Sequence, residues 1–285
     1  MSEPDGSLFS NAGFRRLWIG QAASFVGDAV STVALVVLVV QIAGAASAVG
    51  AALVVRLLPT LASPLAGVFA DRLDRRIVLV TSDLTRAVLA FGMVFAEDLA
   101  TVYVLVFLMG LGQTFFNPTI RAAFPGVVGE GDLARANGLL SATFSISITA
   151  GPALGGVLVA ALGIDAAFLL DSMTYLVSAT FLSRISLPRP EREDATGFGR
   201  DLRDGLSYLA RARVPLAIVV GTFLVILTIN TTIPAGVFLA KETFDAGNVG
   251  YGLLVSVGGG GTLLGSVLMV VLGERVNLVL LYFLS

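Results

Sequence analysis

The sequence contains no cysteine and no histidine. Without cysteine there is no disulfide and no thiolate metal ligand, and without histidine there is no imidazole ligand or histidine-based acid–base pair. Charge is also scarce, since 13% of the residues are charged and the net charge is −2. That balance lacks the basic excess of nucleic-acid-binding proteins. We therefore expect no metal, no cofactor and no nucleic-acid partner, and no catalytic constellation indicates an enzyme.

Apolar residues are abundant instead: they make up 56% of the chain, and the mean hydropathy is +0.90. A helix needs about 20 apolar residues to cross a hydrocarbon core of roughly 30 Å. About eight runs approach that length, and a ninth begins at Leu278. They are too long for strands and lack the alternation of a membrane barrel, so we predict an all-α membrane protein. The runs lie near Leu17–Ala43, Ala48–Ala70, Ile77–Ala96, Ala100–Ile120, Gly138–Leu162, Ala166–Ser183, Val214–Phe238 and Val249–Leu272.

A polar, arginine-rich segment divides these spans into two groups. We expect an N-terminal bundle of six helices over residues 1–185, a linker over 186–213 and a partial second bundle over 214–285. In the linker, Leu202, Leu206 and Leu209 recur at helical spacing, which indicates an amphipathic helix on the inner membrane surface; a solvated linker with a helical turn is an equal alternative. We expect the chain to stop inside the second bundle.

The distribution of Lys and Arg predicts the orientation, because positively charged loops stay in the cytoplasm. With a cytoplasmic N-terminus, the outer loops hold only Lys241. The inner segments then hold Arg15, Arg16, Arg72, Arg75, Arg76, Arg121, Arg135, Arg184, Arg189, Arg192, Arg200, Arg203, Arg211, Arg213 and Arg275.

The most specific motif lies between the second and third spans, from Gly67 to Arg76. A glycine at a helix end allows close helix approach, an acid can cap the next helix, and arginines hold the loop on the inner side. The pattern resembles the G-x-x-x-D-R-x-x-R-R loop of the major facilitator superfamily. The resemblance implies a two-bundle transporter fold and a conformational-gate role for the loop. The matching residues are Gly67, Asp71, Arg72, Asp74, Arg75 and Arg76.

A second motif, in the fifth span, consists of Gly151, Pro152, Gly155 and Gly156. Glycines permit close packing, and proline removes a backbone hydrogen bond and bends the helix. The motif resembles the antiporter element of the same superfamily, which marks exporters; a kinked packing helix is the alternative interpretation. Other segments resemble the bacterial group that exports drugs and siderophores, including macrolide and enterobactin exporters. These segments are Phe14–Gln21, Ser24–Asp28, Arg135–Leu139 and Asp171–Tyr175.

The resemblance implies a proton-coupled exporter of amphiphilic small molecules in the bacterial inner membrane. Its expected partners are the lipid bilayer, a small-molecule substrate and protons. No nucleotide-binding motif indicates a primary pump: the run Gly258–Gly261 is not followed by the Lys-Ser or Lys-Thr of a phosphate-binding loop. The alternatives are an uptake carrier of the same fold and a truncated relative that does not transport.

Ionisable side chains at bilayer depth are costly and are therefore functional candidates. Asp28 lies roughly 16 Å from the inner end of the first span, and Arg56 lies roughly 21 Å from that of the second, at about 1.5 Å per residue. We expect these two side chains to pair on the cavity side of the bundle. Moving a proton on this pair would couple transport to a pH gradient; a static ion pair is the alternative.

Asp83 and Arg86 lie three residues apart near the inner end of the third span, and we expect them to bond and join a gate network. Asp171 lies near the outer end of its span, where we expect it to reach interfacial water, with an outer-gate role as the alternative. The cavity candidates are the deep polar or aromatic residues Gln21, Gln113, Phe116, Asn117 and Asn230. Helix–helix hydrogen bonds are the more common use of such polar residues.

Overall fold

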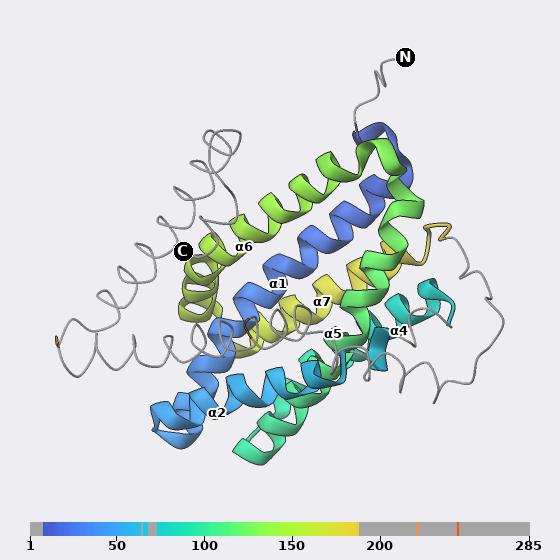
Figure 1. Ribbon diagram of the computed structural model, residues 1–285. Coiled ribbons are helices and arrows are strands. Elements are labelled where there is room, and N and C mark those ends of the chain that lie inside the picture. Colours follow the sequence, from blue (N-terminus) through green and yellow to red (C-terminus); the bar gives the residue numbers. More distant parts are fainter. Residues whose placement is uncertain (1–7, 64, 68–72, 188–220, 222–243, 245–285) are drawn as a thin grey trace.

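Helices form every element of the described part of the chain in the computed structural model (Figure 1). The structure describes residues 8–63, 65–67, 73–187, 221 and 244. The linker, the second bundle and Asn230 therefore lie outside the described residues. The elements are η1 (Leu8–Ser10), α1 (Ala12–Ala43), α2 (Ala46–Leu57), η2 (Leu58–Ala62), α4 (Arg75–Gly92), η3 (Met93–Phe95), α5 (Leu99–Val128), η4 (Glu130–Asp132), α6 (Leu133–Leu162) and α7 (Ile164–Leu182).

Five of these helices are long and apolar enough to cross a membrane: α1, α4 with η3, α5, α6 and α7. They match the first span and the third to sixth spans expected from the sequence. The second predicted span is shorter in its described part and changes character along its length. The α-helix ends at Leu57 and continues as a 3₁₀ helix that contains Pro59. A proline has no backbone N–H to donate, so it interrupts the α-helical hydrogen-bond pattern there.

Local signals set the helix ends. The Asn11 side chain accepts hydrogen bonds from the backbone N–H groups of Gly13 and Phe14 at the start of α1. Gly44 ends that helix with φ of 62°, a left-handed conformation that glycine adopts without steric cost. The Asp74 side chain accepts from the N–H of Arg76 and caps α4. These residues fix where each helix enters and leaves the bundle.

Helix α1 lies between α6 and α7 and packs closely against both (Figure 1). On the α6 side, a Cβ atom placed on Gly151 would overlap the side chain of Ala29. On the α7 side, a Cβ atom on Gly20 would lie 3.3 Å from the Cα of Ser178. Small residues thus allow close helix approach along both contacts. We call them the α1–α6 seam and the α1–α7 seam.

Two apolar clusters fill the bundle, one toward each end. The first contains Val30 to Val39 of α1 together with buried residues such as Val102 of α5 and Phe168 of α7. The second contains Phe14 and Leu17 of α1 with buried residues of the far ends of α5 and α7. Along α1, α4, α5 and α7, buried polar residues lie between these clusters in the chain. The bundle therefore holds a layer of polar side chains between two apolar regions.

Candidate functional site

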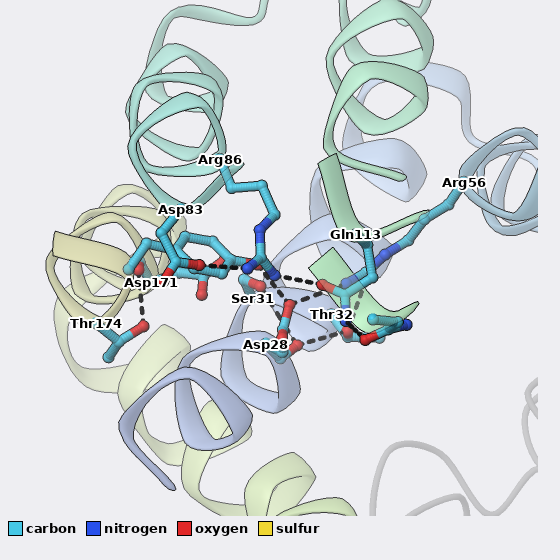
Figure 2. A network of polar contacts seen from close by, with 11 residues as sticks. Asp28, Ser31, Thr32, Arg56, Asp83, Arg86, Gln113, Asp171 and Thr174 are labelled. Carbon is cyan, nitrogen blue, oxygen red and sulfur yellow. Dashed lines mark hydrogen bonds and ion pairs between the residues drawn. The ribbon is translucent and has the colours of Figure 1, made fainter. Parts of the chain in front are cut away.

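The layer is a network of seven side chains contributed by five helices, and Figure 2 shows its principal contacts. We call it the polar layer; it consists of Asp28 on α1, Arg56 on α2, Asp83 and Arg86 on α4, Gln113 on α5, and Asp171 and Tyr175 on α7.

Asp28 and Arg56 form the pair expected from their depths. Arg56 Nη2 lies 3.1 Å from Asp28 Oδ1. The Asp28 side chain is 24% exposed and the Arg56 side chain is 28% exposed. Arg56 Nη1 also donates to the Thr32 hydroxyl at 3.1 Å, and that hydroxyl donates to the Asp28 carbonyl oxygen at 2.7 Å. Partial exposure leaves this pair open to water. A charged pair with access to water can separate without stranding either charge in an apolar medium.

Four side chains contact Arg86, which is 2% exposed. Its Nη2 donates to Asp83 Oδ1 and its Nη1 to Gln113 Oε1. Its guanidinium carbon lies 4.5 Å from the ring centre of Phe116 and 4.4 Å from that of Tyr175. These distances correspond to cation–π contacts on two rings. The bond between Asp83 and Arg86 expected from their spacing is present, and their other described partners lie on α5 and α7.

Tyr175 joins the two ion pairs. Its hydroxyl donates to Asp28 Oδ1 at 2.6 Å, while its ring packs on Arg86. The side chain is buried, with 1% exposed. The sequence pattern places Tyr175 in a family-like segment but assigns it no role. Its position four residues after Asp171, on the same helix face, was the available signal.

Asp171 does not reach interfacial water, so that expectation is wrong. It lies about two turns into α7 and is 0% exposed. Its side chain packs against Gly27 across the α1–α7 seam, and the Ser31 hydroxyl faces it from α1. Among the described residues, neither carboxyl oxygen of Asp171 has a hydrogen-bond partner. The close packing of α7 on α1 buries this acid between the two helices.

The cavity candidates fall in different surroundings. Gln113 donates from Nε2 to Asn117 Oδ1 at 2.9 Å, and Asn117 is exposed. Phe116 is buried against Arg86. Gln21 is 6% exposed on α1, and its Nε2 has no hydrogen-bond partner within the described part of the chain. Of the described cavity candidates, only Gln113 has a hydrogen bond to a charged member of the polar layer.

The described residues include part of the loop motif and the whole of the antiporter motif. In the loop motif, Asp74 caps α4, and Arg75 and Arg76 begin that helix, while Asp71 and Arg72 lie outside the described residues. Gly67 is the last described residue before that gap. In the antiporter motif, Pro152 lies inside α6, and Gly151 and Gly155 line the α1–α6 seam. Nothing lies within 4 Å of a Cβ placed on Gly156, so Gly156 is not part of this close contact.

The polar layer is rich in ionisable groups. Within the ranges described, no group of three or more acidic side chains is placed to hold a metal ion. The layer contains three carboxyl groups and two guanidinium groups. Tyr175 bonds Asp28 and contacts Arg86, and Gln113 bonds Arg86. Gain or loss of one proton would change its net charge by one unit, in surroundings where charge is poorly screened.

Comparison with known proteins places this chain in a family. Residues 6–283 match the family model described as transmembrane secretion effector. The chain is 35% identical over 176 residues to a Bacillus subtilis (strain 168) protein named as a bacilysin exporter, BacE, a match covering 60% of this chain and 43% of the relative. It is 24% identical over 280 residues to macrolide efflux protein A of Streptococcus pyogenes, covering 94% of this chain and 68% of that protein. The chain thus spans less than half of the bacilysin exporter's length.

The fold is also that of a solved transporter. The crystal structure of the POT family transporter PepTSo matches with a TM-score of 0.57 at 15% identity, over 87% of this chain and 52% of that chain. At this identity the likeness concerns the fold alone. It agrees with the all-α membrane fold predicted from the sequence.

Proposed function

This chain belongs to the transmembrane secretion effector family of the major facilitator superfamily, and we propose that it acts as a secondary active exporter of amphiphilic small molecules. Membership of a transporter family makes an enzyme unexpected. Proteins named for the export of bacilysin, of macrolides and of several drugs are among its relatives. The observation that carries the proposal is the polar layer, an ionisable network between two apolar clusters of a transporter-type bundle.

We propose that protons drive the export by alternating access. In this cycle the two bundles of a major facilitator protein rock around a midplane site. The Asp28–Arg56 pair is the place where the polar layer meets water, since both side chains are about a quarter exposed. Opening of the pair exposes its charges further to water, and closing it lets the two charges neutralise each other again. A proton bound or released in the layer changes the balance between these two states.

We propose that the N-terminus is cytoplasmic and that the membrane is the bacterial inner membrane. Arginines gather at the end of the bundle where α1 begins, and in the described residues the opposite end holds Glu97, Asp98 and Asp165 but no Lys or Arg. This asymmetry supports the orientation, because positively charged segments stay in the cytoplasm. The described arginines at that end are Arg15, Arg16, Arg75, Arg76, Arg121, Arg135 and Arg184.

Accumulation of fluorescent dyes in bacterial cells tests export directly. Cells producing the protein should retain less ethidium or Nile red than cells producing an Arg56→Gln variant at equal abundance. A protonophore should abolish the difference. Higher accumulation in cells with the protein would indicate an uptake carrier, and equal accumulation across the dyes and macrolides tried would favour a relative that does not transport.

A further inference from the structure

The charged groups of the polar layer do not balance when all are ionised. Asp28 is paired with Arg56, and Asp83 is paired with Arg86. Each guanidinium therefore already has a carboxylate. Asp171 is the remaining acid, and neither of its oxygens has a hydrogen-bond partner within the described residues.

Of the three acids, Asp171 alone lacks both exposure to water and a paired guanidinium among the described residues. Asp28 is about a quarter exposed, whereas Asp171 and Asp83 are 0% exposed. Asp83 forms an ion pair with Arg86. Asp171 instead packs so closely on Gly27 that a Cβ placed on Gly27 would lie 2.6 Å from Asp171 Oδ1. An ionised carboxylate with no paired cation in such a site, faced by the Ser31 hydroxyl, is strongly disfavoured, and a buried acid of this kind holds a proton instead.

We propose that Asp171, rather than Asp28, takes up and releases the coupled proton; this rests on the proposed proton-coupled transport. In the described state Asp171 is the neutral acid, and the layer then holds two carboxylates and two guanidinium groups. Release breaks the O–H bond of Asp171, leaves its electron pair on the carboxylate and passes the proton to cavity water. The reverse step restores the bond.

The groups that face Asp171 link its protonation to movement of α7 against α1. Across the seam from α1 come Asp28 and the Ser31 hydroxyl, and beyond them are Arg56 of α2 and Arg86 of α4. Asp83 of α4 accepts a hydrogen bond from Arg86, and Tyr175 lies one turn away on α7. Once ionised, Asp171 competes with Asp28 for Arg56 and with Asp83 for Arg86. Since the α1–α7 seam has no spare room at Gly27, satisfying the new charge requires α7 to shift against α1.

Infrared spectroscopy tests the protonation without any substrate. The purified protein in lipid vesicles should retain the carbonyl stretch of a protonated carboxylic acid at a pH where surface acids are ionised. Asp171→Asn should lose that band. Asp165→Asn, which removes an exposed acid of the same helix, should keep it. Persistence of the full band in Asp171→Asn would overturn the assignment.

A pair of conservative variants keeps the test valid if Asp171→Asn does not fold. Asp171→Glu keeps a titratable acid and should shift the frequency of the band. Asp28→Glu keeps the negative charge beside Arg56 and should leave the band where it is. A shift in Asp28→Glu and none in Asp171→Glu would assign the proton to Asp28 and contradict the proposal.

Transport in the same vesicles separates this proposal from the proposed function. With ethidium inside, an imposed pH gradient should drive transport by the wild type and by Asp165→Asn. In vesicles with Asp171→Asn, gradient-driven ethidium transport should fall to the level of protein-free vesicles. This variant should still exchange labelled for unlabelled ethidium without a gradient. If the wild type responds and Asp171→Asn responds equally, Asp171 is not the proton carrier and the exporter proposal stands. If exchange occurs but the wild type ignores the gradient, proton coupling fails, and the role of Asp171 fails with it.

Discussion

Helix α1 uses two of its faces in different ways. Toward α6 it presents Ala29 and Val30 to Gly151 and Gly155. These two helices also share a hydrogen bond from Trp18 to the Thr143 hydroxyl and the Phe25–Phe144 ring pair, neither of which involves an ionisable group. Toward α7 it also packs through small residues, but this seam contains Asp171 and borders the bond from Tyr175 to Asp28. Both seams allow close approach, but of the two only the second contains a buried acid in the described part of the chain. On the proposed role of Asp171, a change of protonation acts on the α1–α7 seam and leaves the α1–α6 seam in place.

The largest effect should come from removing the buried cation beside the α1–α7 seam. Arg86→Met leaves Asp83 buried without a counter-ion, which should lower the free energy of unfolding by about 3–5 kcal/mol. Unfolding in detergent micelles measures it. Arg121→Met, at an exposed arginine of α5, is the matched control and should change little. Equal stability of the two variants would mean that the buried pair does not stabilise the bundle.

A smaller effect should come from adding one methyl group to the α1–α6 seam. Gly151→Ala brings a Cβ into Ala29, and overpacking of this kind costs about 1–3 kcal/mol. Gly156→Ala is the matched control, because a Cβ there meets nothing within 4 Å. Adding Ala29→Gly to Gly151→Ala should restore the midpoint of thermal unfolding. Failure of this rescue would show that the loss has another origin than contact with Ala29.

The link between the two ion pairs should have a measurable but modest energy. Tyr175→Phe keeps the ring on Arg86 and removes only the hydroxyl that donates to Asp28, so we expect a loss of about 1 kcal/mol. A double-mutant cycle with Asp28→Asn isolates this bond. Additive effects of the two substitutions would indicate that Tyr175 does not couple the pairs.

The smallest effect concerns Asp98, which lies outside the spans at the start of α5. Hydrogen bonds from the Thr101 hydroxyl and from the Thr101 N–H lower the pKa of Asp98 below its usual 3.8. A lowered pKa in the folded state contributes stability above the unfolded-state pKa, and this is lost as the pH falls through the folded-state pKa. Asp98→Asn, which keeps a capping oxygen, should lose this acid-sensitive component. If the free energy of unfolding of the variant and of the wild type changed identically between pH 5 and roughly pH 3, this prediction would be contradicted.

The sequence predicted much of the fold because span length and helix rise are fixed by the bilayer and the backbone. The same arithmetic placed Asp28 and Arg56 at matching depths, and the pair is present. It did not predict the surroundings of Asp171 or the contacts of Tyr175. In a membrane helix both the lipid-facing and the buried faces are apolar, so periodicity does not reveal which neighbour a side chain meets. The change to a 3₁₀ helix at Pro59 was readable from proline chemistry but does not alter the span pattern.

The central claim is that the polar layer links protons to transport, and the Asp28→Asn variant tests it most directly. Loss of this charge frees Arg56 to pair with Asp171 and hold it ionised, so the proton can no longer return. In vesicles with an imposed pH gradient, the account predicts that this variant loses proton-driven ethidium transport while exchange without a gradient continues. Undiminished proton-driven transport by Asp28→Asn would contradict it.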